Sequence, residues 1–537
     1  MPFKKNNRKI EIYDTTLRDG AQNPGVSFTT EDKLRIIAEL DNFGMDYIEA
    51  GNPAANPKDA EVFLKAASLN LKNAKLVAFG STCRVNANAE RDENLNILNA
   101  VKTDYTAVFG KSSLLHVEKI IKTTGDENLR IIFDSIEFLS RTKKVFFDAE
   151  HFFDGYRYNK KYALKVLETA CLAGAEKIIL CDTNGGNMPG YISDVTKKVV
   201  EYISLLNKNI IVGIHCHNDS GLADACSLAA VKSGAVQVQG TINGIGERCG
   251  NANLCVVIPN LQLKLNYNCV PEENLKNLTR LARYISDVSN LTFDEKMPYA
   301  GGHAFTHKAG MHIDGVFKLP ESFEHIRPEL TGNTRTTLIS EFAGRSALLN
   351  ILNKINKNNK LIITKDSEIL ENVLGLIKSR EKDGYQFENA EGSLSLLLLK
   401  SLNRNREFFS VEKFNLLLSE PEKNSKKTGA LIKIKVDGTE EITADEGDGP
   451  VNALDKALRK ALTRFYPELS DMRLIDYKVR VLNSNEATAA KVRVLIESAD
   501  NSRTWRTVGV NTDIIEASWN ALLDSVEYKL SLNAGLL

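Results

Sequence analysis

The sequence has no excess of charge of either sign, since its 537 residues include 69 Lys and Arg and 69 Asp and Glu. A balanced charge gives no basic surface of the kind that binds nucleic acid or an anionic membrane. The chain also lacks an apolar run long enough to span a bilayer, and its basic start, MPFKKNNRKIEIYD, lacks the apolar stretch of a secretory signal. These absences favour a cytoplasmic protein whose partners are small molecules and other protein chains.

Cysteine is scarce, and its eight occurrences form no CxxC pair. Three of them, Cys171, Cys181 and Cys216, lie within apolar segments, which favours reduced, buried thiols over disulfides or a zinc site. A chain of this length is too long for one hydrophobic core, so we expect two or three domains.

What is present, up to about residue 265, is an alternation of short apolar strand-like segments with helical stretches. The eight strand-like segments are IEIYD, DYIEAG, KLVAFG, YTAVFG, KVFFDAE, KIILCD, IVGIHCH and VQVQGTING. Strand and helix in alternation predict a parallel sheet, and eight units closing on themselves predict a (β/α)8 TIM barrel, an α/β fold with its catalytic groups at the strand ends. A doubly wound open sheet is the alternative, but no GxGxxG follows the first strand.

Polar side chains gather where these predicted strands end. They are Arg18, Asp19, Glu49, Glu150, Asp182, Thr183, His215, His217 and Asn243. In a TIM barrel all of these positions open onto one face, so the sequence predicts a site there.

The rest of the chain divides into a mostly helical part and a repeat. The segment 271–404 includes a Gly- and His-rich stretch, GGHAFTHKAGMHIDG. From 405 to 537, VEKFNLLLSE resembles LIDYKVRVLN, ALIKIKV resembles AKVRVLI, and PVNALDKALRKAL resembles IIEASWNALLDSV. Each unit reads as alternating strands followed by an amphipathic helix, which predicts a pseudo-symmetric α+β domain for ligand binding or dimerisation. The predicted domains are therefore 1–270, 271–404 and 405–537.

The pair His215 and His217, in IVGIHCHND, is the strongest single indication of chemistry. Residues i and i+2 of a strand project from the same face, so two imidazoles arrive side by side at the end of a buried strand. Two imidazoles and a carboxylate suit a divalent metal and leave positions open for substrate. The alternative, a pair of hydrogen-bonded core histidines, is disfavoured by the motifs around it.

Four motifs in this order carry a resemblance that covers nearly the whole chain: DTTLRDGAQ, IHCHND, NGIGERCGNANL and HKAGMHIDG. They resemble the acyl-CoA condensing enzymes of the 2-isopropylmalate synthase and homocitrate synthase family, whose leucine- or isoleucine-sensing domain is similar to the C-terminal repeat. Within that family, FFDAEHFFDGY, FEHIRPELTGN, GRS and TWRTVGVNTDIIEASW are most similar to the branch that condenses acetyl-CoA with pyruvate to (R)-citramalate.

The resemblance implies a metal-assisted acyltransferase that opens the threonine-independent route to isoleucine. It implies a divalent cation, with Mn, Mg, Zn and Co not distinguished, held by Asp19, His215, His217 and, from GNANL, Asn251. Beside it, Arg18 is expected to pair with the ketone oxygen as it gains charge. Thr183 resembles the position that binds the oxo-acid carboxylate. Arg18 as a structural ion-pair partner and Asn251 as a loop cap are the alternatives.

The acetyl methyl group needs a positioned base, and the family pattern implies His312, oriented by Glu150, for this role. Asp314 is expected to support His312 or the substrate. In the segment where relatives usually carry a tyrosine this chain has Phe323, which therefore stays out of the catalytic set. Further expectations are a homodimer and feedback by isoleucine or leucine.

Other functions stay open at this point. A sister enzyme such as a 2-isopropylmalate synthase differs only in pocket size, and a lyase of the 3-hydroxy-3-methylglutaryl-CoA type shares the barrel and the metal site. A catalytically inactive amino-acid sensor is the third alternative. The C-terminal repeat argues against the lyase, because feedback sensing belongs to biosynthesis, and intact Arg18, Asp19, Glu150 and His312 argue against the inactive sensor.

Overall fold

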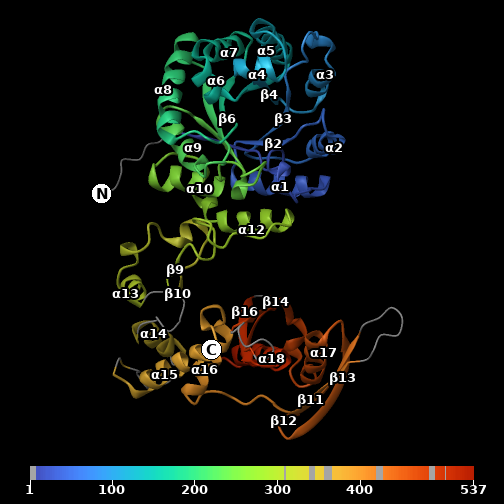
Figure 1. Cartoon of the computed structure of the whole chain (residues 1–537), viewed down its shortest axis with the longest axis vertical. Coiled ribbons are helices and arrows are strands. Elements are labelled where there is room, and N and C mark those ends of the chain that lie inside the picture. The colour runs from blue at the N-terminus through green and yellow to red at the C-terminus, as the bar shows by residue number, and fades with distance from the viewer. Residues whose placement is uncertain are drawn as a thin grey trace. The chain divides into compact units, whose positions relative to one another are not determined.

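The computed structural model describes residues 8–307, 310–337, 345–355, 364, 366–418, 427–482, 490–501 and 503–537. The chain forms two compact units, and Figure 1 shows the elements of each. The first extends to Phe305 and includes Ile326–Arg335; the second comprises Thr306–His325 and Thr336–Leu537. The predicted boundaries at about 270 and 404 stay a proposal.

Eight strands of the first unit form a closed barrel in which each pairs with its sequence neighbours and β1 closes against β8. The pairs are all parallel. The strands are β1 (Glu11–Asp14), β2 (Tyr47–Gly51), β3 (Lys75–Ser81), β4 (Tyr105–Lys111), β5 (Lys144–Glu150), β6 (Lys177–Asp182), β7 (Ile211–Cys216) and β8 (Gln237–Gly240). The predicted TIM barrel is confirmed, and the open doubly wound sheet is excluded.

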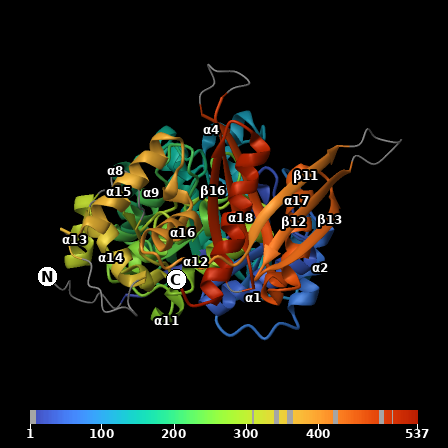
Figure 2. The ribbon, with the colours of Figure 1, turned by 90° about the horizontal axis from the view of Figure 1, so that it is seen from below.

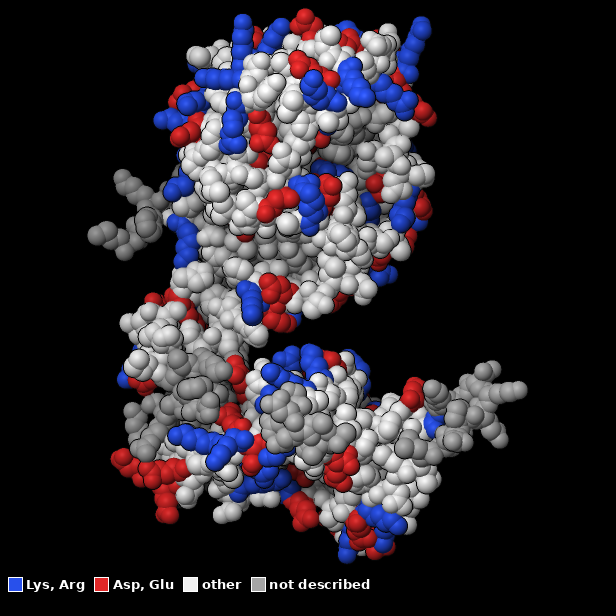
Figure 3. Space-filling model, in the orientation of Figure 1, with Lys and Arg blue, Asp and Glu red and all other residues white. Residues whose placement is uncertain are grey.

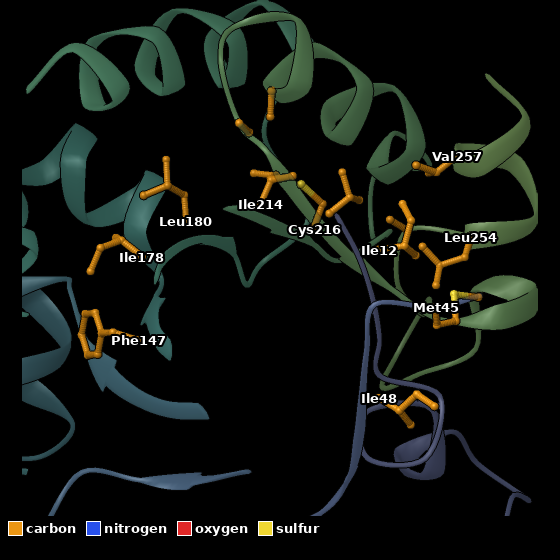
Figure 4. Packing of buried hydrophobic residues seen from close by; sticks show 14 of the residues in the cluster. Ile12, Met45, Ile48, Phe147, Ile178, Leu180, Ile214, Cys216, Leu254 and Val257 are labelled. Carbon is orange, nitrogen blue, oxygen red and sulfur yellow. The ribbon is translucent and has the colours of Figure 1, made fainter. Parts of the chain in front are cut away.

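Helices cover the outside of the barrel (Figure 1) and bury the outward-facing apolar side chains of its strands. They are α1 (Thr30–Phe43), α2 (Pro57–Ala66), α3 (Glu93–Ala100), α4 (Leu114–Lys119), α5 (Gly125–Ser140), α6 (Phe152–Tyr158), α7 (Lys160–Leu172), α8 (Pro189–Leu206), α9 (Ala223–Lys232) and α10 (Leu254–Pro259), followed by α11 (Glu272–Leu275) and α12 (Leu278–Val288). Figure 4 shows Leu180, Ile214 and Leu254 among the apolar side chains of this layer, all of them buried.

A layer of aromatic rings fills the barrel interior near the start of its strands. Tyr13, Tyr47 and Phe146 come from three different strands and contact one another, with ring centroids 5.1–6.1 Å apart. Lys177 donates to the Tyr47 hydroxyl at 2.9 Å and pairs with Glu11. Packed side chains thus occupy this end of the barrel, and polar side chains occupy the other.

The second unit contains two three-stranded antiparallel sheets, each followed by a long helix. Their elements are β11 (Ser410–Leu418), β12 (Thr428–Val436), β13 (Thr439–Gly447) and α17 (Pro450–Thr463), then β14 (Arg473–Val481), β15 (Val492–Ala499), β16 (Thr504–Asn511) and α18 (Ile514–Asn533). Figure 2 shows α18 along β16 and α17 beside β12 and β13.

Strand register confirms the predicted repeat. Phe414 of β11 pairs with Ile432, and Tyr477 of β14 pairs with Ile496 in the same place of the second sheet. The remaining elements of this unit are β9 (Thr306–His307), α13 (Gly310–Lys318), β10 (Thr336–Thr337), α14 (Arg345–Ile355), α15 (Glu368–Lys382) and α16 (Glu391–Ser401).

On the face shown in Figure 3, basic and acidic side chains are interspersed, as the balanced composition leads one to expect. In the described part of the chain, no helix combines the length and apolar character needed to cross a membrane.

Candidate active site

The two predicted histidines and the predicted aspartate meet at the C-terminal end of the barrel. His215 lies in β7, His217 follows that strand, and Asp19 lies in the turn after β1. The two Nε2 atoms are 3.3 Å apart, and Asp19 Oδ2 lies 3.5 Å from His215 Nε2 and 4.0 Å from His217 Nε2. One ligand atom from each residue therefore faces a common point, and all three side chains are buried.

A glutamine on the next strand fixes the orientation of His215. Gln239 stands opposite His215 in the pairing of β7 with β8, and its Oε1 lies 3.1 Å from His215 Nδ1. A carbonyl oxygen can only accept, so Nδ1 carries the proton and Nε2 keeps its lone pair. Gln239 Nε2 in turn points to Asp148 Oδ1 at 3.5 Å. Burial lowers the pKa of His215 to about 3, and it also lowers that of His217, which keeps both rings neutral.

Among the described residues, several buried polar atoms at this site have no hydrogen-bond partner. They are Asp19 Oδ1, His217 Nδ1 and Asn251 Oδ1. Asn251 is placed by a backbone bridge to His217. Leaving buried polar atoms unpaired costs free energy, so three such atoms on the Asp19, His217 and Asn251 side chains favour a site that binds a ligand. Carboxylate, imidazole and amide donors fit a divalent cation such as Mn²⁺, Mg²⁺, Zn²⁺ or Co²⁺.

Arg18 is held on three sides beside this centre. Its guanidinium donates to both oxygens of Glu49 at 3.0 and 3.2 Å, donates to Asp19 Oδ2 at 3.0 Å, and stacks 3.9 Å from the Phe79 ring centre. Burial alone would raise the pKa of Asp19, but the charge of Arg18, with smaller contributions from His215, His217 and Asn251, brings that pKa below its ordinary value. Arg18 therefore does form the ion pairs that the structural alternative expected. The same ion pairs hold its guanidinium at the cavity.

A cavity of about 210 Å³ opens at this point. Its walls are formed by Arg18, Asp19, Gln22, Phe79, Phe109, Asp148, Glu150, Cys181, Thr183, His215, His217 and Glu247. Phe79 and Phe109 stack with ring centres 5.5 Å apart and narrow one side of it. Burial raises the pKa of Asp148 to about 8, and the nearby Glu49 charge acts in the same direction. The carboxyl groups of Asp19, Glu49 and Asp148 thus lie near the single guanidinium of Arg18. This excess of acidic groups favours the binding of a cation in the cavity.

Thr183 and Glu150, at the ends of β6 and β5, also line this cavity. The Thr183 hydroxyl accepts from the backbone N–H of His151 at 2.8 Å, which leaves its own proton to donate. Glu150 ends β5 directly opposite Lys111 at the end of β4, and the two form an ion pair. His151 has a left-handed backbone, φ 54°, and its ring packs 4.0 Å from that of His116.

The predicted residues of the Gly- and His-rich stretch lie in the second compact unit. On α13, His312 is exposed and its ring packs against Phe323, with centroids 5.0 Å apart, while Asp314 pairs with Lys318 at 2.6 Å. His307 lies 3.2 Å from Glu324. His312 and Glu150 belong to different compact units, so the expected approach of His312 to Glu150 stays a prediction.

Gln239, Lys111 and Asp148 are among the residues of the site that were not predicted from the sequence. The alternation in VQVQG places Gln237 and Gln239 on one face of the last strand, and this signal was available. Lys111 directly follows the segment YTAVFG, and Asp148 lies two residues before Glu150. Two predicted strand-end residues have structural roles instead. Asn243 donates to Ala282 O and Ser286, and Asp182 accepts from Asn187.

The barrel and its Asp-His-His centre define a TIM-barrel protein with a candidate metal site. Residues 9–285 match the HMGL-like family, 300–379 match the homocitrate synthase post-HMGL domain-like family, and 388–530 match the LeuA allosteric (dimerisation) domain. A hydroxymethylglutaryl-CoA lyase structure from Pseudomonas aeruginosa aligns with a TM-score of 0.44 and 20% identity over 53% of this chain and 95% of that chain.

Curated relatives match almost end to end. An (R)-citramalate synthase of Aquifex aeolicus is 51% identical over 97% of this chain and 98% of its own length. Those of Geobacter sulfurreducens and Synechocystis are 48% and 46% identical over 97% of this chain and 97% and 96% of theirs. The chain belongs to the (R)-citramalate synthases of the HMGL-like family.

Proposed function

We propose that the chain condenses acetyl-CoA with pyruvate to give (R)-citramalate and coenzyme A. The observation that carries the proposal is the fixed guanidinium of Arg18 beside the open face of Asp19, His215 and His217. A 2-oxo acid offers a carboxylate and a ketone oxygen on adjacent carbons, and this pair fits such a centre. Identity of 51% and 48% with two (R)-citramalate synthases, over 97% of this chain, supports the choice of substrates.

A divalent cation held by Asp19, His215, His217 and Asn251 would polarise the ketone and stabilise the alkoxide. Arg18 adds a permanent positive charge beside the ketone oxygen. Thr183 donates its hydroxyl proton to the substrate carboxylate.

In the proposed sequence, His312, oriented by Glu150, removes a proton from the acetyl methyl group. The resulting carbanion attacks the ketone carbon of pyruvate, a carbon–carbon bond forms, and the ketone oxygen takes up a proton. Water then cleaves the thioester, which releases coenzyme A as the thiol and leaves a second carboxylate on the product. Asp314 is proposed to support His312 or the substrate.

We propose that the cavity favours the smallest oxo acid. Phe79 and Phe109, which stack on each other in its lining, would limit the space for a longer substrate side chain. One extra methylene changes binding by about 1–3 kcal/mol, so a related enzyme for a larger oxo acid, such as a 2-isopropylmalate synthase, is the alternative.

The test is thiol release from acetyl-CoA by the full chain with pyruvate, 2-oxobutyrate and 2-oxoisovalerate as acceptors. We expect kcat/KM to be highest with pyruvate. A higher value with 2-oxoisovalerate would assign the chain to the 2-isopropylmalate reaction, and no thiol release with any acceptor would contradict the synthase proposal.

We further propose a cytoplasmic homodimer in which isoleucine, and more weakly leucine, binds the C-terminal repeat and inhibits. The match of 388–530 to an allosteric dimerisation domain and the duplicated sheet-and-helix unit support this. In this proposal the product enters the threonine-independent route to isoleucine, whose end product would signal back to its first step.

A further inference from the structure

An arginine in the loop after β8 contacts the loops that follow both β6 and β7. Arg248 Nη2 donates to the backbone oxygen of Thr183, directly after β6, at 2.7 Å. The same guanidinium donates to both carboxylate oxygens of Asp219 in the loop after β7, from Nε at 2.7 Å and from Nη2 at 2.9 Å. Paired contacts of this kind fix the direction of a guanidinium as well as its position. Arg248 therefore ties the loops after β6, β7 and β8 to one another.

In the proposed function each of these loops carries a different working residue. The loop after β6 carries Thr183, which binds the substrate carboxylate. The loop after β7 begins at His217, two residues before Asp219, and the loop after β8 carries Asn251, three residues after Arg248. A backbone bridge between His217 and Asn251 already joins the last two loops. The contact from Arg248 adds the carboxylate-binding residue to the two proposed metal ligands.

Thr183 is held at two of its atoms. Its hydroxyl oxygen accepts from the backbone N–H of His151 at 2.8 Å, and its backbone oxygen accepts from Arg248. One side-chain torsion separates the hydroxyl from the backbone, and it is stiff in a β-branched residue. A turn of the Thr183 backbone would therefore turn the hydroxyl as well, so the contact from Arg248 acts on the direction of the hydroxyl.

Backbone contacts on either side of Thr183 hold its neighbours. His217 N donates to Asp182 O at 3.2 Å, and Ser220 N donates to Gly185 O at 3.0 Å. Neither contact reaches the carbonyl of Thr183. The charged donor of Arg248 is thus the contact that fixes the peptide group between Thr183 and the residue after it.

Stability alone does not explain an arginine at this position. The Arg248 side chain is 38% exposed, and ion pairs of exposed side chains contribute little to stability. Its backbone is left-handed, with φ 57°, a conformation that favours glycine or asparagine over a long side chain. An unfavourable backbone conformation beside a cavity is an indication of a functional role.

We propose that Arg248 is a positioning residue that holds Thr183 in the orientation which binds the 2-oxo-acid carboxylate. It acts through Thr183 and contacts no substrate atom. The inference rests on the proposed function, because it takes an oxo acid as the ligand of Thr183. Loss of the guanidinium should therefore weaken binding of the oxo acid, while the backbone bridge of His217 with Asn251 keeps the metal ligands together.

Calorimetric titration of the full chain, loaded with Mn²⁺ and without acetyl-CoA, measures pyruvate binding. Arg248→Ala is expected to raise the Kd for pyruvate about tenfold or more and to keep the natural Mn²⁺ content by mass spectrometry. Arg248→Lys should lie between, because one ammonium cannot reproduce the paired contacts. In steady-state kinetics the KM for pyruvate should rise by a larger factor than kcat falls.

Arg141→Ala is the matched control. Arg141 is also exposed and paired with two carboxylates, Glu90 and Glu137, at 2.8 Å each, and it lies outside the lining of the active-site cavity. It should bind pyruvate as the natural chain does, and thermal unfolding curves check that each variant is folded. Natural pyruvate affinity in Arg248→Ala, an equal loss in Arg141→Ala, or loss of Mn²⁺ in Arg248→Ala would overturn the proposal.

A double variant tests whether Arg248 acts through Thr183. Thr183→Ala alone removes the hydroxyl and is expected to weaken pyruvate binding. In the Thr183→Ala chain, the further change Arg248→Ala should have little effect, because no hydroxyl remains to be oriented. Losses that add fully in the double variant would show that Arg248 does not act through this hydroxyl and would overturn the positioning role.

Hydrogen exchange tests the orientation of Thr183 without any substrate. The N–H of His151 is bonded to the Thr183 hydroxyl, so Arg248→Ala should speed exchange in the peptide that contains His151, and Arg141→Ala should leave it unchanged. If the natural chain binds no oxo acid and releases no thiol, the proposed function fails, and faster exchange in Arg248→Ala would still support the orientation of Thr183 by Arg248. Unchanged exchange at His151 in Arg248→Ala would refute that orientation.

Discussion

Three of the proposed metal ligands, Asp19, His215 and Asn251, are oriented by a neighbouring residue. Gln239 determines the tautomer of His215, Arg18 keeps Asp19 ionised, and the backbone bridge to His217 places Asn251. Such supporting contacts orient the donor atoms before a cation arrives, and their loss typically lowers metal affinity about 10- to 100-fold.

Replacing His217 with alanine is expected to remove most of the bound metal and the thiol-release activity, because one of two imidazole donors is lost. Metal content after dialysis, measured by mass spectrometry, gives the result. His303→Ala is the matched control, since that exposed histidine lies outside the cavity lining. Full metal content and full activity in His217→Ala would show that the cation binds elsewhere.

Replacing Arg18 with lysine is expected to lower kcat by about 100-fold or more while the chain stays folded. A lysine ammonium cannot make the paired contacts to Glu49 and also face the cavity, as the planar guanidinium does. Steady-state kinetics with pyruvate and a thermal unfolding curve check both parts. A loss below about threefold would argue against transition-state stabilisation by Arg18.

At the scale of elements, the two repeats share a packing feature, a glycine in the sheet where the following helix packs against it. Gly447 at the end of β13 and Gly509 in β16 each face the helix that follows. A Cβ atom on Gly447 would lie 2.4 Å from Ala453 N, and one on Gly509 would lie 2.0 Å from Ala517 O. Both glycines thus allow a helix backbone to approach its sheet closely.

Gly509→Ala is therefore expected to lower the free energy of unfolding by about 1–3 kcal/mol, because α18 must move away from β16. Chemical denaturation followed by circular dichroism measures the change. Gly429→Ala in β12 is the matched control, since a Cβ there would meet Leu417 at 3.6 Å, an ordinary contact. Equal stability of the two variants would contradict the close-packing explanation.

The sequence predicted the elements better than it predicted the contacts between them. Short apolar segments were sufficient to predict the barrel strands, period-two alternation to predict those of the C-terminal repeat, and the HxH spacing to predict that His215 and His217 meet. Gln239 and Lys111 could not be predicted in the same way, because they depend on the register between neighbouring strands. That register places Gln239 opposite His215 and Lys111 opposite Glu150. Register follows from how the whole barrel closes, and no single strand carries that information.

At the scale of the whole molecule, the two units have separate hydrophobic cores. Within the part of the chain that the structure describes, the barrel core and the cores of the second unit share no residue. Separate cores of this size favour separate unfolding transitions over one two-state transition.

Scanning calorimetry is expected to show two transitions that respond to different ligands. A chelator should lower the temperature of one, because bound metal stabilises only the folded barrel, and L-isoleucine should raise the temperature of the other. A single transition that both additions shift would indicate that the units unfold together.

The cysteines differ in exposure, and this difference makes one of them suitable for selective chemical labelling. Cys249 is exposed, while Cys171 is partly buried and the other six are buried. It directly precedes Gly250, whose carbonyl accepts from Asn218 N at 2.9 Å, and Asn251 follows. A fluorophore attached at Cys249 would therefore be two residues from a proposed ligand, and its emission would give an optical titration of metal occupancy without any substrate.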